Sequence, residues 1–461
     1  MKRILIANRG EIARRIIRSA HALKLETVAV YSEADADAPH VHEADRAVAI
    51  GPSPARDSYL NATRVLAAAR EAGADAVHPG YGFLSENAGF AEAVRAAGLV
   101  WIGPEPATLR AMGDKQRARA IAEAAGVPVV PGSDRLPEAM EPAALARAAE
   151  AVGYPLLVKA AAGGGGIGMR RVDDPASLAD AVRTTQSLAV RAFGDGTTFL
   201  ERFVARARHV EVQVFGLGDG RAVHLFDRDC SLQRRFQKVV EEGPAPGLPD
   251  TVRARMAEAA LALCRATRYK GAGTVEFIVD AESHAFYFLE MNTRIQVEHP
   301  VTEMITGTDL VAMQIDLARG TLGPLGQGMI AAQGHAVECR LYAENPRRAF
   351  MPSPGPLTRF VMPRPDADLR IESGYLEGDA ITPYYDPMLA KLIARGPTRA
   401  AAIARLRMAL DVVHVEGVVT NRDFLLACLG HTGFVSGRMY TRFIDEHLSD
   451  LVPPTEAGTA R

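Results

Sequence analysis

The sequence lacks a basic excess, a long apolar run and a secretory signal. Its 461 residues carry 53 Lys and Arg against 55 Asp and Glu, for a formal net charge of −2. Proteins that bind nucleic acid or anionic membranes need a basic surface, and this balance gives no sign of one. No run of 18 apolar residues occurs, and the apolar stretch at the N-terminus is too short for a signal peptide. These absences predict a cytoplasmic protein that binds neither nucleic acid nor membrane.

Cysteine is also scarce. Cys230, Cys264, Cys339 and Cys428 are widely spaced, without a CxxC pair, which argues against a zinc site or a disulfide scaffold. Two interpretations of Cys230, in "RDCS", stay open: a reactive thiol near Lys238, or a buried and inert residue. We favour the second.

The N-terminal quarter of the chain alternates between two kinds of segment. From Ile4 to about Val130, short apolar runs are followed by alanine-rich amphipathic stretches, a pattern that predicts a doubly wound parallel sheet. Active sites in such sheets lie beyond the carboxyl ends of the strands, where the polar stretches 7–12 and 78–87 are expected. From about Val204 onward, apolar residues alternate in segments such as "HVEVQVFG" and "GTVEFIVD", which predicts an antiparallel sheet. We therefore expect a mixed α/β and α+β fold.

A glycine-rich stretch, "LLVKAAAGGGGIGMRRV" (156–172), stands between these regions. It contains GxGxxG, but "MRRV" after the glycines predicts a second strand rather than the helix of a dinucleotide site. A P-loop would need a lysine after the glycines, and here Lys159 precedes them. Strand, glycine turn and strand are typical of a flap that closes over nucleotide phosphates, because glycine lets backbone amides approach the anion. A flexible surface loop is the alternative.

A run of polar residues follows two apolar strands near residue 290. From Glu290 to Glu298 every second residue is polar, so in an extended chain these side chains would share one face. A solvated edge is the alternative interpretation. Carboxylate and amide oxygens suit Mg²⁺. We predict that Glu276, Glu290 and Asn292 hold one or two Mg²⁺ on the ATP phosphates, with Arg294 and Glu298 facing the acceptor.

Six blocks of sequence, taken in order, resemble one family. They are "IANRGEIARRI", "HPGYGFLSEN", "RDCSLQRRFQKVVEEGPAP", "EMNTRIQVEHPVTE", "HAVECRLYAENP" and "YYDPMLAKLI", and the resemblance spans Ile4 to about His447. The chain resembles the biotin carboxylase component of biotin-dependent carboxylases, an ATP-grasp enzyme. The resemblance implies an N-terminal domain at 1–115, an ATP-grasp domain at 116–330 with a mobile lid at about 131–203, and a C-terminal antiparallel-sheet domain at 331–447. Residues 448–461 are expected to form a disordered tail.

The resemblance also implies roles for individual residues. Lys238 and Arg294 match bicarbonate contacts, Glu298 matches the base that takes the bicarbonate proton, and Arg340 matches the arginine that stabilises the biotin enolate. Gln296, Val297 and Tyr81 are expected in the bicarbonate and biotin site, although the turn around Tyr81 could equally be structural. The match to the metal ligands Glu276, Glu290 and Asn292 agrees with the period-two pattern. The expected nucleotide contacts are Lys115, Lys159, Gly163, Gly164, Gly165, Gly166, Met169, Glu201, His209, Gln233, Glu276, Ile278 and Glu290.

The reaction implied is the ATP-dependent carboxylation of biotin by bicarbonate through carboxyphosphate, with Mg²⁺ or Mn²⁺. The sequence has no Met-Lys-Met, so we expect biotin on a separate biotin carboxyl carrier protein and a separate carboxyltransferase. The family implies a homodimer. This would be the first half-reaction of an acyl-CoA carboxylase, such as the acetyl-CoA carboxylase of fatty acid biosynthesis or a propionyl-CoA carboxylase. Which acyl-CoA is used depends on the carboxyltransferase and stays open.

Two residues depart from the family pattern. Ile167 stands where relatives commonly have Arg or Lys, and Phe236 stands where they have His or Asn. Neither side chain offers the expected polar contact, so we expect an active enzyme with altered ATP kinetics. Another ATP-grasp ligase and a regulatory chain without turnover are the alternatives. Arg340 and the "RDCSLQRRFQK" block favour biotin carboxylase.

Overall fold

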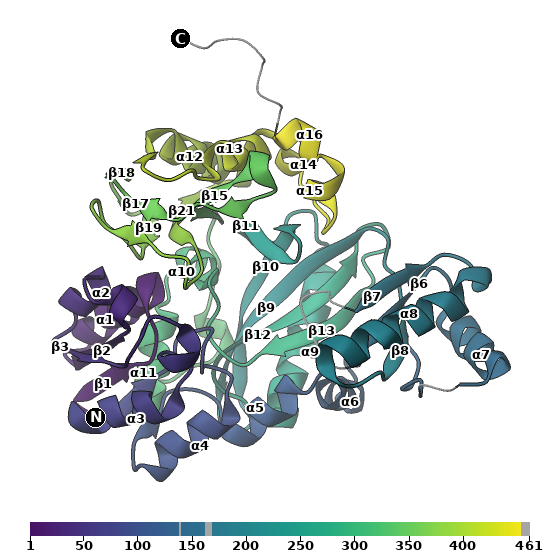
Figure 1. Cartoon of the computed structure of the whole chain (residues 1–461), viewed down its shortest axis with the longest axis horizontal. Helices are drawn as coiled ribbons and strands as arrows, with labels where there is room; N and C mark the ends of the chain where they lie inside the picture. Colours follow the sequence, from purple (N-terminus) through teal and green to yellow (C-terminus); the bar gives the residue numbers. More distant parts are fainter. Residues whose placement is uncertain (138–139, 162–167, 453–461) are drawn as a thin grey trace, which may run out of the picture.

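A five-stranded parallel sheet forms the N-terminal part of the chain (Figure 1). The structure is a computed structural model and describes residues 1–137, 140–161 and 168–452. The strand order is β3-β2-β1-β4-β5. On the central strand, Ile4 and Ile6 pack into one apolar cluster and Leu5 into another, so both faces are covered. This confirms the predicted doubly wound sheet. Its elements are β1 Arg3–Ile6, α1 Gly10–Ala22, β2 Glu26–Tyr31, α2 Pro39–Glu43, β3 Arg46–Ala49, α3 Ala62–Glu71, β4 Ala76–His78, α4 Ala88–Ala96, β5 Val100–Trp101 and α5 Pro106–Gly113.

A small antiparallel sheet carries the glycine-rich stretch. Its strands lie in the order β7-β6-β8, and this unit projects from the molecule on the side away from the N-terminal sheet (Figure 1). Lys159 on β6 lies opposite Met169 on β7, as the predicted strand, turn and strand require. Gly163, Gly164, Gly165, Gly166 and Ile167 lie outside the described residues. The elements are α7 Pro142–Val152, β6 Leu156–Ala160, β7 Met169–Val172, α8 Pro175–Phe193 and β8 Thr198–Arg202.

The centre of the molecule is an eight-stranded sheet, in the order β13-β12-β9-β10-β11-β14-β21-β19. All its strand pairs are antiparallel, which confirms the prediction made for this region. Because β11 pairs with β14, one sheet runs across the predicted boundary at residue 330. The elements up to that boundary are α6 Lys115–Ala124, β9 Ala207–Leu217, β10 Ala222–Arg234, β11 Gln237–Gly243, α9 Asp250–Thr267, β12 Lys270–Asp280, β13 Phe286–Asn292, α10 His299–Thr306 and α11 Leu310–Arg319.

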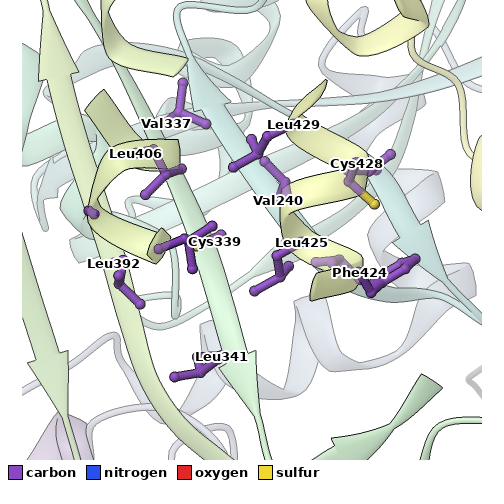
Figure 2. Packing of buried hydrophobic residues seen from close by; sticks show 14 of the residues in the cluster. Val240, Val337, Cys339, Leu341, Leu392, Leu406, Phe424, Leu425, Cys428 and Leu429 are labelled. Carbon is purple, nitrogen blue, oxygen red and sulfur yellow. The ribbon is translucent and has the colours of Figure 1, made fainter. Parts of the chain in front are cut away.

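Two helices pack against strands β14 and β21 of this sheet. Figure 2 shows Leu406 of α12 and Leu425 and Leu429 of α13 lying over the strands that carry Cys339 and Leu392. Burial of these apolar side chains joins strands and helices into one core. The elements are β14 His335–Tyr342, β15 Glu344–Asn345, β16 Met351–Pro352, β17 Gly355–Pro356, β18 Arg359–Val361, β19 Leu369–Ser373, β20 Ala380–Ile381, β21 Met388–Gly396, α12 Arg399–Val412, β22 His414–Glu416, α13 Arg422–Gly430, α14 Thr432–Val435, α15 Phe443–Glu446 and α16 Leu448–Leu451.

The extended run predicted from Glu290 to Glu298 is wrong beyond Asn292. There β13 ends, opposite Thr274 of β12, and the chain continues without regular structure to α10. Pro300 is the second residue of α10 and favours a helix start, so the segment turns into a helix instead of extending the strand. The polar side chains therefore converge through a loop.

The predicted tail also begins later than expected. Leu448–Leu451 forms the short helix α16, and the Leu451 side chain is buried in the C-terminal core, so burial holds this segment in place. Residues 453–461 lie outside the described residues. In the part of the chain that the structure describes, no helix combines the length and the apolar character needed to cross a membrane.

Candidate active site

A buried lysine, Lys238 of β11, is surrounded by three carboxylates. Its Nζ donates to Glu211 at 2.6 Å, to Glu276 at 3.0 Å and to Glu298 at 2.5 Å. Burial alone would lower the pKa of the Lys238 ammonium, but the negative groups around it hold the pKa well above its usual value. Glu211 belongs to β9, Glu276 to β12 and Glu298 to the loop before α10. Lys238 therefore links two strands of the sheet to this loop.

The period-two pattern of β9 explains why Glu211 faces this lysine. Val210, Val212 and Val214 lie in the apolar core, so His209 and Glu211 point to the opposite face of the sheet. On that face Glu211 also accepts a hydrogen bond from the fully buried Arg228, at 2.7 Å. One face of β9 therefore packs into the apolar core, and the other face carries polar side chains into the site.

Glu298 lies between two cations. Besides Lys238, Arg340 of β14 donates to it at 3.0 Å, and Arg340 in turn donates to Glu241 at 2.7 Å. Burial opposes ionisation, yet Lys238, Arg340 and Arg228 hold the pKa of the Glu298 carboxyl well below its usual value. Glu298 is therefore ionised over the whole physiological pH range.

The predicted metal ligands lie together on β12 and β13. Glu276 and Glu290 stand directly opposite each other, and Asn292 donates from Nδ2 to Glu276 Oε1 at 2.8 Å. Burial and the Glu276 charge raise the pKa of the Glu290 carboxyl. Like charges that face each other across antiparallel strands are unfavourable, and a cation between them would relieve the repulsion. Two carboxylates and an amide oxygen fit Mg²⁺.

The predicted nucleotide residues form two groups. In the first, Gln233 contacts the His209 ring at 3.3 Å, Ile278 lies opposite His209 in the sheet, and the His209 ring lies 2.9 Å from Glu276. Lys115, the first residue of α6, acts electrostatically on Glu290 of the same group.

The second group belongs to the small antiparallel sheet. Lys159 donates to Glu201 at 2.7 Å, and Met169 is the cross-strand neighbour of Lys159. Among the described residues, no hydrogen bond or ion pair joins this group to the first. Lys159 therefore lies in the small antiparallel sheet, whereas the predicted metal ligands lie in the eight-stranded sheet.

The predicted substrate residues occupy the loop between β13 and α10 and its surroundings. Arg294 donates to Asn292 at 2.9 Å, and Gln296 donates to Glu276 at 2.8 Å. The carbonyl of Val297 accepts from Lys391 at 2.7 Å, and the Tyr81 hydroxyl donates to Glu11. The site therefore combines residues from all three predicted domains, at 1–115, 116–330 and 331–447.

Sequence reasoning missed several charged residues of the site. Glu211 could have been found, because it is two residues from His209 in an alternating strand. Glu86 pairs with Arg294 at 3.1 Å, and this contact joins residues more than 200 positions apart. Only the tertiary structure brings such pairs together. The missed residues are Glu11, Glu86, Glu211, Arg228, Glu241 and Lys391.

The two interpretations of Cys230 are resolved by its surroundings. The thiol is buried, and burial together with the Glu211 charge raises its pKa well above the usual value. Cys230 is therefore an inert core residue. Phe236 lies at the tip of the β10–β11 hairpin, where its side chain is 62% exposed.

Three family models match successive parts of the chain. The biotin carboxylase N-terminal domain matches residues 1–109, and the biotin carboxylase C-terminal domain matches residues 338–446. Between them, residues 114–324 match the ATP-binding domain of the carbamoyl-phosphate synthase L chain. Together they cover most of the sequence.

Similar proteins match almost the whole length of the chain. Biotin carboxylase 1 of Bacillus subtilis is 48% identical over 97% of this chain and 99% of its own length. The α subunit of rat mitochondrial methylcrotonoyl-CoA carboxylase is 49% identical over 98% of this chain, which spans 63% of that relative.

Solved structures agree with this likeness. The biotin carboxylase of Campylobacter jejuni, solved as a β-γ-ATP complex, has a TM-score of 0.91 at 42% identity and covers 97% of this chain and 99% of its own. The biotin carboxylase domain dimer of Hydrogenobacter thermophilus 2-oxoglutarate carboxylase, in complex with MgADP, ADP and bicarbonate, has a TM-score of 0.90 at 42% identity. It covers 98% of this chain and 99% of that chain.

Proposed function

The chain belongs to the biotin carboxylase family of ATP-dependent ligases, and we propose that it transfers the carboxyl group of bicarbonate to N1 of biotin. ATP supplies the driving force, and the products are N1-carboxybiotin, ADP and phosphate. The observation that carries the proposal is the Glu298 carboxylate held between Lys238 and Arg340, next to the facing pair Glu276 and Glu290. One site thereby combines a base, an anion-binding pair and a metal-binding pair.

ATP is bound between the two nucleotide groups. Lys159 and the glycines of the lid bind the phosphates from one side, and Lys115, His209, Gln233 and Ile278 bind the nucleotide from the other. Glu276, Glu290 and Asn292 would hold Mg²⁺ or Mn²⁺, which would supply positive charge beside the phosphates. Because Lys159 is paired with Glu201 at 2.7 Å, nucleotide phosphate competes with this carboxylate for the ammonium.

Bicarbonate binds next to Glu298. Its negative charge attracts the Lys238 ammonium and the Arg294 guanidinium, which then share their charge between the substrate and the protein carboxylates. Glu298 is held at a low pKa by its cations, so this competition raises its pKa toward the range of an effective base. Glu298 then takes the bicarbonate proton as the oxygen attacks the γ-phosphate of ATP.

Biotin accepts the carboxyl group at the opposite end of the same ion-pair chain. The carbon–oxygen bond of carboxyphosphate breaks to give CO2 and phosphate, and the phosphate takes the N1 proton of biotin. The Arg340 guanidinium stabilises the negative charge that this leaves on the ureido oxygen, and N1 then bonds to CO2. Gln296, the Val297 backbone and Tyr81 line this end. Carboxyphosphate is hydrolysed by water, so closure of the lid protects it until biotin arrives.

We place this reaction as the first half-reaction of an acyl-CoA carboxylase. Support comes from the methylcrotonoyl-CoA carboxylase α subunits among the relatives, of which the chain spans 61–64%. We further propose a homodimer, with biotin presented by a separate carrier protein and a carboxyltransferase as a further partner. The dimer described for the Hydrogenobacter domain supports this assembly. A cytoplasmic location stays a prediction.

The test is ADP release by the purified chain with Mg-ATP and bicarbonate, with and without free biotin. We expect turnover that requires bicarbonate and rises with biotin. Loss of a general base or of a charge-stabilising group costs about 10²-fold or more, so Glu298→Gln and Arg340→Ala should each lower kcat by at least that factor.

A matched control pair joins the same sheet to helix α12. Glu242 is buried and accepts from Arg399 at 2.8 Å, outside the site. Glu242→Gln and Arg399→Ala should therefore keep the kcat of the folded protein. ATP binding without any response to biotin would contradict the proposed function and favour a regulatory chain or another acceptor.

A further inference from the structure

Lys391 of β21 is a fully buried lysine at the point where three parts of the chain meet. Its Nζ donates to the Val297 carbonyl at 2.7 Å and pairs with Glu11 Oε1 at 3.1 Å. The lysine belongs to the C-terminal region, Glu11 to α1 of the N-terminal sheet, and Val297 to the loop before α10. None of the steps described above uses this ammonium.

The contact with Val297 fixes the peptide that leads directly into Glu298. Residues 293–298 have no regular structure, so the position of the Glu298 backbone depends on contacts from outside the loop. Arg228 holds the preceding side chain, Gln296, at 2.8 Å, and Lys391 holds the carbonyl of Val297. A shift of about 1 Å in a reacting group can cost about 10²-fold in rate. The Lys391 contact therefore bears on the geometry of the base.

The contact with Glu11 continues to Tyr81. Glu11 Oε1 also accepts from the Tyr81 hydroxyl, and the backbone carbonyl of Tyr81 is held by Asn8 at 2.7 Å. Tyr81, Glu11, Lys391 and Val297 thus form one continuous chain of hydrogen bonds and ion pairs. This chain links the loop after β4 to the loop that carries the base.

The surroundings of Lys391 are strongly charged. Glu372 and Arg340 are its cross-strand neighbours, and Glu338 and His299 lie within electrostatic range. Burial of an ammonium is costly and is offset only by paired and hydrogen-bonded partners. Removal of one partner from such a pair leaves an uncompensated buried charge and lowers stability. The stability of each variant therefore has to be measured beside its activity.

We propose that Lys391 is a positioning residue, which holds the Val297–Glu298 peptide so that Glu298 lies between Lys238 and Arg340, and which couples this peptide through Glu11 to Tyr81. The proposal rests on the proposed function, since it assigns Lys391 to the base of that reaction. It predicts that the loss of Lys391 lowers the rate of the bicarbonate-dependent step without weakening ATP binding.

The experiment compares wild type with Lys391→Met, Glu11→Gln and the control Arg399→Met. Arg399 also holds a carboxylate and a carbonyl, Glu242 at 2.8 Å and Phe434 at 2.7 Å, but it does not contact the loop before α10. Thermal unfolding gives the stability of each variant. ADP release, measured against ATP, bicarbonate and biotin in turn, gives kcat and the three KM values.

We expect Lys391→Met to lower the kcat of bicarbonate-dependent ADP release by about tenfold or more, while its KM for ATP stays within about twofold of wild type. Glu11→Gln keeps the acceptor for Tyr81 and removes the charge, so kcat should fall in the same way but less. Arg399→Met should lower the unfolding temperature and leave kcat unchanged.

A folded Lys391→Met protein with the kcat of wild type would overturn the proposal. So would a fall in kcat accompanied by an equal effect in Arg399→Met, because that would mark a general loss of packing. Should Lys391→Met fail to fold, an unchanged kcat in Glu11→Gln would overturn it. Wild-type protein that releases ADP without a response to biotin would contradict the proposed function alone, and the ratio of wild-type to variant bicarbonate-dependent rates would still decide the role of Lys391.

Discussion

Phe236 occupies an unfavourable backbone conformation at the tip of the β10–β11 hairpin. Arg234 pairs with Gln237, so Arg235 and Phe236 form a two-residue turn, with φ of 47° and 68°. Turns with two positive φ values favour Asn-Gly, and a residue with a side chain costs about 1 kcal/mol or more in this region.

We therefore predict that Phe236→Gly raises the free energy of unfolding by about 1 kcal/mol. The Phe236 side chain is largely exposed, so its burial does not offset the cost of the positive φ. The measurement is a denaturant titration of both proteins. Phe236→Ala, which keeps a side chain at the same φ, is the control and should gain little. Equal stability of the glycine and alanine variants would contradict the strain argument.

Glu338 is a buried carboxyl that stands opposite Glu241 in the sheet, and neither of its oxygens has a hydrogen-bond partner among the described residues. Burial raises its pKa well above the usual value, with a further contribution from the Glu241 charge. The native state therefore keeps the Glu338 proton to a higher pH than the unfolded chain does. Its favourable contribution is complete below the usual glutamate pKa and is lost as the pH rises toward the folded pKa.

We accordingly predict that Glu338→Gln, which mimics the neutral acid, gains stability relative to wild type as the pH rises from 5 to 8. Unfolding temperatures of both proteins across that range give the answer. Glu372→Gln is the control: burial opposes ionisation of Glu372, but Arg370 and Arg18 lower the pKa of this carboxyl to about 2, so its difference from wild type should stay constant from pH 5 to 8. A constant difference between Glu338→Gln and wild type across the range would show that Glu338 stays ionised.

At the residue scale, sequence pattern gave the site residues that belong to regular strands. Glu276, Glu290 and Asn292 come together because their strands pair in the expected register. Arg294, Gln296 and Glu298 converge for another reason, since their loop is anchored by residues distant in sequence. Partners such as Glu86 and Lys391 carry no local signal. Their contacts arise only when the three parts of the chain pack together.

Among the elements, helix α8 of the small antiparallel unit has the clearest local determinants. Asp174 caps it by accepting from the amides of Ala176 at 2.9 Å and Ser177 at 3.2 Å, and Pro175 is its first residue. Leu178 and Val182 pack it onto β6 in a core separate from that of the large sheet. This unit can therefore open without unfolding the rest of the protein.

Loss of the Asp174 cap should cost about 1 kcal/mol, so we predict that Asp174→Ala raises amide hydrogen exchange about fivefold in α8 and β6–β8. Exchange in β9, β10 and β12 should not change, and these strands are the internal control. Asp174→Asn, which keeps a capping oxygen, should stay close to wild type. Faster exchange throughout the protein would contradict an independent unit.

The sequence predicted whether a segment is a helix or a strand better than it predicted the residue at which that element ends. The alternation in β9 and the strand, turn and strand of β6 and β7 were both recognisable from residue type. The end of β13 at Asn292 was not, because the polar alternation continues to Glu298 while the backbone turns. What stops the strand is the start of α10 and the tertiary anchoring of the loop, and neither has a period-two signature.

At the scale of the whole molecule, Glu303 of α10 joins the three parts of the chain. It accepts from Arg15 of α1 at 2.9 Å, from Arg370 of β19 at 2.6 Å and from the amide of Leu310 at 2.7 Å. Glu303 and Arg15 are buried, so little solvent screens the charges. The helix that begins after Glu298 is thus fixed at its far end to both the N-terminal sheet and the C-terminal region.

Removal of one partner from a buried ion pair leaves an uncompensated charge and costs about 3–5 kcal/mol. We predict that Glu303→Gln lowers the unfolding temperature strongly. It should also weaken the contacts of α10 with both the N-terminal sheet and the C-terminal region, because Arg15 belongs to α1 and Arg370 to β19. Hydrogen exchange should therefore accelerate in α1, α10 and β19 at once. Glu242→Gln, which breaks the buried pair with Arg399 in another part of the molecule, is the control and should leave exchange in α1 and β19 unchanged. Acceleration confined to α10 in Glu303→Gln would mean that the helix is held by its own packing and that the ion pairs do not connect the three parts.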